Sequence, residues 1–97
     1  MHLAWMALEA KFKVQGKSLD EKDADGFTPR QKFFLCWANG WCRNTRPESL
    51  RVQVLTNPHS IARLRVNNVV SNMPEFQDGF ACKAGAAMVR ADRCRVW

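Results

Sequence analysis

One short segment holds the residue types that could act on a substrate. Residues 57–65 read NPHSIARLR, so His59 follows the helix-breaking pair Asn57-Pro58, and Arg65 comes six residues later. A loop histidine can donate a hydrogen bond to a developing oxyanion, and an arginine can grip a peptide carbonyl with two N–H groups. A lone loop histidine is more often an ordinary surface residue, so these two residues are candidates that need further support.

Motifs that build a complete catalytic centre are missing from the sequence. The chain has two histidines, His2 and His59, and contains no H-E-x-x-H, no P-loop, no G-x-S-x-G and no glycine-rich dinucleotide turn. Acidic residues crowd positions 20–25, but their spacing misses that of a calcium loop, and a solvated turn is the better interpretation. We therefore expect this chain to hold neither a metal nor a cofactor by itself.

The four cysteines, Cys36, Cys42, Cys82 and Cys94, allow two interpretations. Cys36 and Cys42 are predicted to share one helix, where six residues mean about 9 Å of rise and about 240° of rotation, too far for a disulfide. No pair has the C-x2-4-C spacing of a zinc knuckle. The cysteines are thus either buried free thiols or partners of residues that this sequence does not contain.

Length and charge limit the classes of function. With 97 residues, the chain forms one small domain or a piece of a larger one. The net charge is +6, and the positive excess lies in residues 30–65. This excess would suit nucleic acid or an acidic partner, but no homeodomain, zinc-finger or RNP-like motif accompanies it, so nucleic-acid binding is not expected. No apolar run approaches the roughly 18–20 residues that span a bilayer, and we identify no export signal at the first residues.

Helices are predicted to position the candidate residues. Apolar residues at 3–4 spacing predict a helix over 2–15, and its first two turns are apolar nearly all round, which demands burial on several sides. The sequence Thr28-Pro29-Arg30-Gln31 has the form of a capping box with proline at the first helical position, and predicts a helix from Pro29 to about Asn44. The aromatic stripe Phe33, Trp37 and Trp41, with Phe34 and Ala38 alongside, is interpreted as its core face.

Two similar capping patterns follow, at Thr45-Arg46-Pro47-Glu48 and Asn72-Met73-Pro74-Glu75. They predict helices over 47–55 and 74–80. Residues 61–70 combine β-branched residues with some alternation, so they could form an extended segment or a short helix. The tail 81–97 is predicted to be irregular and held by Cys82, Cys94 and Trp97. The fold class is therefore mainly α, with a possible short extended segment near 61–70.

Four segments of the chain, in this order, resemble the end of the neprilysin and endothelin-converting-enzyme family, and the bacterial oligopeptidases of that family most of all. They are FTPRQKFFLCWANGWCRNTRPESLR, LTNPHSIARLRV, SNMPEFQDGFACK and the terminal CRVW. The resemblance covers residues 26–97. Residues 2–15 are similar to the helix that follows the family's E-x-x-x-D segment.

The resemblance implies a mainly helical, extracytoplasmic enzyme that cleaves peptides with one zinc ion. In the family, two histidines of H-E-x-x-H and the glutamate of E-x-x-x-D hold the zinc. We expect both motifs upstream of Met1. Residues 1–97 would then be the carboxyl-terminal part of a peptidase catalytic domain, with the upstream part and a peptide substrate as partners. As an isolated chain it would bind no zinc and be inactive.

Two functional positions of the family match this sequence. His59 falls at the family's H-S-P position, where the imidazole stabilises the oxyanion. Arg65 falls at the arginine that binds a backbone carbonyl of the substrate. Ile61 departs from the family by replacing the proline that usually follows His-Ser, but this change leaves both functional side chains in place.

The resemblance also bears on the thiols. Cys42, Cys82 and Cys94 match family cysteines whose disulfide partners lie upstream, which implies an oxidising compartment. Cys36 has no such match and is expected to be a core thiol. Two other functions stay open: a non-catalytic interaction module that docks through the apolar first helix, and a small basic nucleic-acid-binding protein.

Overall fold

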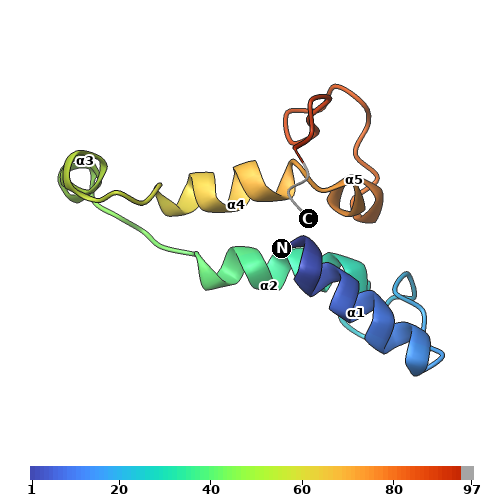
Figure 1. Ribbon diagram of the computed structural model, residues 1–97. Helices are drawn as coiled ribbons and strands as arrows, with labels where there is room; N and C mark the ends of the chain where they lie inside the picture. Colours follow the sequence, from blue (N-terminus) through green and yellow to red (C-terminus); the bar gives the residue numbers. More distant parts are fainter. Residues whose placement is uncertain (95–97) are drawn as a thin grey trace.

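The computed structural model describes residues 1–94 as five helices joined by loops (Figure 1). They are α1 (His2–Val14), α2 (Pro29–Gly40), α3 (Pro47–Thr56), α4 (Ala62–Val70) and α5 (Pro74–Gly79). No strand occurs in this part of the chain, which confirms the mainly α prediction. The choice that the sequence left open for 61–70 resolves as a helix. None of the five helices is both long and apolar enough to cross a bilayer.

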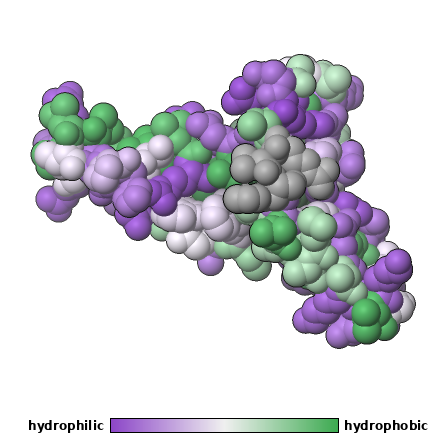
Figure 2. Space-filling view, viewed as in Figure 1, coloured by the Kyte–Doolittle hydropathy of each residue, from purple (hydrophilic) through white to green (hydrophobic). Residues whose placement is uncertain are grey.

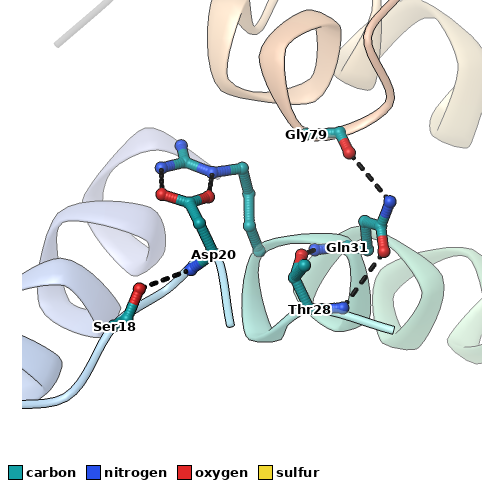
Figure 3. Close-up of polar contacts among 6 residues, drawn as sticks. Ser18, Asp20, Thr28, Gln31 and Gly79 are labelled. Carbon is teal, nitrogen blue, oxygen red and sulfur yellow. Dashed lines mark hydrogen bonds and ion pairs between the residues drawn. The ribbon is translucent and has the colours of Figure 1, made fainter. Parts of the chain in front are cut away.

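The predicted capping box closes the amino terminus of α2 (Figure 3). Thr28 Oγ1 accepts the Gln31 backbone N–H at 3.1 Å, and Gln31 Oε1 accepts the Thr28 backbone N–H at 3.1 Å. Pro29 at the first helical position lacks the N–H that would have stayed unsatisfied. The start of α2 is therefore fixed by local sequence alone.

The predicted caps of α3 and α5 are wrong by one residue. Each helix begins at its proline, so the N-caps are Arg46 and Met73, and neither side chain makes a capping hydrogen bond. Thr45 and Asn72 lie one residue further from the helix than a cap does. Asn72 has another use, because its Oδ1 accepts the backbone N–H of Cys94 at 3.0 Å and fastens the irregular tail.

The helix α2 ends at Gly40, about four residues before the predicted end, with Trp41 as its C-cap. Glycine in a helix carries a high entropy cost, which favours an end at this position. Cys42 consequently lies outside the helix, and the prediction that Cys36 and Cys42 share one helix is wrong. The prediction of a core thiol is also wrong, because Cys36 is exposed beside an uncovered groove between α1 and α2.

Phe34 is the centre of the core. Its ring stacks on Trp5 of α1, with centroids 5.9 Å apart, and meets Phe76 of α5 edge-on at 5.4 Å. Such aromatic pairs stabilise a fold beyond the area that they bury. The fully buried apolar side chains of the described residues are Trp5, Phe34, Val70 and Met73.

Of the predicted core face of α2, Phe34 alone is fully buried. Phe33 and Trp37 are only partly buried and pack against the edge of the core. Trp41, beyond the end of the helix, is not part of the core at all. Its ring contacts that of Trp37, with centroids 5.9 Å apart, and also contacts the guanidinium of Arg65, described below.

A polar junction joins the loop after α1 to α2 and α5 (Figure 3). Arg30 binds the Asp20 carboxylate through Nε at 2.7 Å and Nη2 at 3.1 Å, and its guanidinium lies 5.1 Å from the Trp5 ring centroid. These hydrogen bonds hold the pKa of Asp20 below its usual value, so the pair's stabilisation is lost as the pH falls through that lowered pKa. Gln31 Nε2 donates to the Gly79 carbonyl at 2.9 Å.

The molecule is extended for its length. It measures 48 × 30 × 24 Å, and its radius of gyration is 15.6 Å, against about 12.5 Å expected for a compact domain of this size. Its accessible surface is 7321 Å², against about 5,700 Å² for a compact monomer of equal mass. α3 stands at the tip of an arm, well apart from the core (Figure 1).

Apolar side chains are exposed on α1 and on the α3 arm (Figure 2). Leu55 on the α3 arm is 84% exposed, and Val14 at the end of α1 is 88% exposed. Only Trp5 of α1 is fully buried. The burial on several sides that the sequence of α1 demands is therefore not supplied by residues 1–94.

The junction gives a first prediction. In Gly79→Ala, the added methyl group would lie 2.9 Å from Arg30 Cδ and push that side chain away from Trp5 and Asp20. We expect a loss of roughly 1–2 kcal/mol in the free energy of unfolding, as for other overpacked sites. Gly40→Ala, at the corresponding last position of α2, meets nothing within 4 Å and should be neutral or slightly stabilising. Urea unfolding followed by tryptophan fluorescence measures both, and equal midpoints for the two variants would contradict this role of Gly79.

Candidate functional site

His59 lies on the loop that joins α3 to α4. Asn57 ends α3 in an extended conformation, as expected for a residue before proline. Its Oδ1 accepts the His59 backbone N–H at 2.9 Å, which fixes the turn. The His59 side chain is exposed and lines the hollow described below. The loop thus presents an imidazole at the surface and anchors its backbone.

Arg65 lies in the first turns of α4 and is held on two sides. Its Nε donates to the Ser60 carbonyl at 2.9 Å. The guanidinium stacks over the Trp41 ring, 4.7 Å from the centroid. Neither contact uses the terminal Nη groups, and within residues 1–94 those groups make no further hydrogen bond. The arginine is therefore oriented and still has two donor groups to offer a ligand.

The two candidate residues share one hollow of about 210 Å³ at the end of α2 and the start of α4. The two helices lie side by side there, which brings the loop after α2 next to the loop before α4 (Figure 1). The structure thus brings together His59 and Arg65, which the sequence singled out. The hollow is lined by Trp41, Arg43, Gln53, His59, Ser60, Ala62 and Arg65.

Sequence reasoning missed the role of Trp41. The i, i+4, i+8 spacing from Phe33 assigned it to the core, but the helix ends one residue before it. The signal that could have found it is Gly40, because a helix that ends at this glycine takes Trp41 off the apolar stripe. Arg43 was noticed only as part of the basic stretch, not as a residue of this hollow.

The hollow is positively charged. Ion pairs elsewhere in the described residues join Arg30 to Asp20, Lys32 to Asp23 and Asp25, and Arg90 to Asp92. Arg43 and Arg65 form no ion pair within residues 1–94. No carboxylate lines the hollow either. A site of this kind favours an acceptor: a carbonyl, an oxyanion or a carboxylate.

The residues that the structure describes do not fit a zinc site. Across positions 1–94, no three His, Cys, Asp or Glu side chains gather closely enough to hold a metal ion. A structural or catalytic zinc ion needs at least three protein ligands.

All four thiols are free. Cys36, Cys42 and Cys94 are exposed, and Cys82 is half-buried with Sγ 3.9 Å from the Phe80 carbonyl oxygen. Residues 80–94 form no helix or strand, as predicted for the tail. Trp97, which was expected to help hold the tail, lies outside the described residues.

Comparison with known proteins identifies the family. The model of peptidase family M13 matches residues 1–96, nearly the whole chain. The chain belongs to peptidase family M13. This confirms the neprilysin-like resemblance carried by the four sequence segments. No solved structure matches the chain significantly.

Curated relatives agree with this assignment. Neprilysin-1 of Caenorhabditis elegans is 42% identical over 73 residues, which is 75% of this chain and 10% of the relative. Neprilysin-3 of Drosophila melanogaster is 33% identical over 97 residues, 93% of this chain and 12% of the relative. Endothelin-converting enzyme 1 of Bos taurus is 42% identical over 72 residues, 74% of this chain and 10% of the relative. This M13 chain thus spans about a tenth of the length of the relatives that it matches.

The stacking of Arg65 on Trp41 gives a second prediction. The Arg65 Nε–H should show a ring-current shift and slow exchange with water in ¹⁵N-correlated NMR spectra, because it lies over the indole and donates to Ser60. Trp41→Leu should remove the shift and speed the exchange several-fold. The Arg63 Nε–H, on an exposed side chain two residues away, serves as the internal control. An unchanged Arg65 signal in the variant would show that Trp41 does not hold the guanidinium.

Proposed function

We propose that residues 1–97 form the carboxyl-terminal part of the catalytic domain of an M13 zinc endopeptidase that hydrolyses peptide bonds in oligopeptides. In this proposal His59 donates a hydrogen bond to the oxyanion that develops on the scissile carbonyl. Arg65 donates to a backbone carbonyl of the substrate. The observation that carries the proposal is that both residues line one hollow, with Arg65 already oriented by Trp41 and Ser60.

The orientation of Arg65 matters for catalysis. A flexible arginine loses side-chain entropy when it binds a ligand, whereas a guanidinium that is already stacked and hydrogen-bonded loses less. Holding the substrate backbone in register also fixes where its scissile carbonyl lies relative to His59. Positioning of this kind supports a role for the hollow in binding an extended peptide.

Zinc is the metal of the family and, in this proposal, is held by residues outside this chain. When bound, it would supply Lewis-acid chemistry at the peptide carbonyl. The residues of this chain bind and orient the substrate and stabilise charge. We therefore propose that the chain is inactive alone and that its first partner is the rest of the same peptidase.

The cysteines support an oxidising location for the parent protein. Cys42 and Cys94 are exposed and Cys82 is half-buried, and none is paired within this chain. We propose that these three pair with cysteines in the rest of the peptidase, as the family resemblance implies. Disulfides of this kind persist in extracytoplasmic compartments, which we propose as the location of the whole protein.

One observation favours a second function, that of a non-catalytic interaction module. An apolar groove of about 720 Å³ lies between α1 and α2, lined chiefly by apolar side chains such as Leu8, Phe12 and Trp37. A free groove of this size suits a protein partner. A stable, monodisperse chain that binds a separate protein through this groove would favour the second function; aggregation of the chain would favour a fragment.

The main proposal is tested in a longer chain that joins residues 1–97 to the family's H-E-x-x-H and E-x-x-x-D segments. We expect His59→Ala to lower kcat by about 10²–10³, the usual effect of losing one oxyanion donor. His2→Ala, at the other histidine of residues 1–97, is the control and should leave kcat close to that of the parent chain. Chromogenic peptide hydrolysis measures both, with the 97-residue chain plus zinc as the blank. Equal kcat in His59→Ala and the parent would remove His59 from the site.

A further inference from the structure

We propose that Arg43 is a specificity residue that binds a carboxylate of the peptide substrate next to the carbonyl held by Arg65. This inference rests on the proposed function and extends it to a substrate class: peptides with an acidic group at the position that enters the hollow. Arg43 lines the hollow together with Arg65, and neither role assigned to His59 or Arg65 uses it.

The position of Arg43 follows from the early end of α2. The helix stops at Gly40, so Arg43 falls in the loop that leads to α3, and not on a continuing helical face. That loop lies beside the start of α4, where Arg65 is held. Because Arg65 is oriented by two contacts inside this chain and Arg43 is exposed, the two arginines can serve separate acceptors.

The electrostatics of the hollow favour an anion. Two guanidinium groups line the hollow, and no carboxylate does. The two positive charges repel each other, and a bound anion would offset that repulsion. Gln53, which also lines the hollow, can add a neutral N–H donor. A carboxylate matches the planar fork of arginine and can accept two hydrogen bonds from it. The arrangement therefore suits an acidic group better than an amide.

The size of the hollow suits one side chain or terminal group of an extended peptide, and the rest of that peptide would lie outside it. Its volume of about 210 Å³ is below the roughly 300–1,000 Å³ of sites that enclose drug-sized ligands. A peptide can present its acidic group in two ways, through an Asp or Glu side chain or through its terminal carboxylate. Both share the same chemistry, and the experiment below separates them.

The experiment uses the longer active chain and two kinds of matched peptide pair. The first kind of pair differs by Glu or Gln at one position, and one such pair is made for each position near the scissile bond. The second kind differs by a free or an amidated terminal carboxyl group. We expect the parent chain to cleave one carboxylate member about tenfold better than its amide partner, as kcat/KM, and Arg43→Gln to erase that preference without slowing the amide peptides. Arg43→Glu should reverse it in favour of a Lys-bearing peptide. The pair whose preference Arg43→Gln erases shows whether Arg43 binds an acidic side chain or the terminal carboxylate.

Arg63→Gln is the matched control, since it removes one positive charge two residues from Arg65 and its side chain does not line the hollow. It should leave the preference unchanged. Three results would overturn the role of Arg43 while leaving the proposed function standing. They are an equal loss of kcat/KM on carboxylate and amide peptides in Arg43→Gln, an equal effect of Arg63→Gln on the preference, and a parent chain without any preference. A parent chain that cleaves no peptide would instead refute the proposed function.

Discussion

The packing of Phe34 against aromatic side chains from other elements is the contact on which the arrangement depends. It ties α2 to α1 through Trp5 and to α5 through Phe76. With Val70 of α4 in the same core, α2 and α4 are held side by side. That pairing places Trp41, just past one helix, beneath Arg65 in the first turns of the other. The hollow is thus a consequence of a core centred on Phe34, seven residues before Trp41 in the sequence.

The helices themselves could be predicted from local sequence. Thr28 followed by Pro29 and Gln31 specifies the start of α2 without any tertiary contact, because every group in the capping box lies within four residues. Gly16, with φ of +61°, follows the end of α1 as a left-handed residue, the conformation that glycine favours after a helix. Prolines likewise placed the starts of α3 and α5 within one residue.

The faces of the helices could not be predicted with the same success. Phe33 and Phe34 are adjacent aromatic residues, and periodicity does not say which one meets α1 and α5. Both rings contact Trp5, but Phe34 alone also contacts Phe76 and Phe80, and the structure buries it for that reason. Cys36 was assigned to a core that the described chain does not build. The nature of 61–70 was also undecidable locally, since Val69 and Val70 suit a strand as well as a helix.

The candidate site was predictable in part, for a chemical reason. His59 and Arg65 stand out by residue type, and a turn after Asn57-Pro58 brings the loop to the surface. Trp41 and Arg43 could not be found in the same way, because they lie about twenty positions before His59 and Arg65 in the sequence. Their part in the site depends on where α2 ends, and that depends on a single glycine.

The surface of the molecule points to a larger structure. A chain with roughly 1,700 Å² more accessible area than a compact monomer of its mass exposes about twice the area that one partner buries in a standard protein interface. The exposed apolar residues of α1 and the α3 arm lie on opposite sides of the core (Figure 2). Covering both would need protein on more than one side, which fits a piece of a catalytic domain better than a module with one docking face.

The most direct measurement is a structure of the longer chain with a bound peptide analogue whose tetrahedral oxygen mimics the oxyanion. We expect a His59 ring nitrogen about 2.7–3.1 Å from that oxygen, and an Arg65 Nη group at hydrogen-bond distance from a backbone carbonyl of the analogue, with the guanidinium still over Trp41. An analogue bound elsewhere, or either side chain turned away from it, would contradict the assignment of this hollow to peptide hydrolysis.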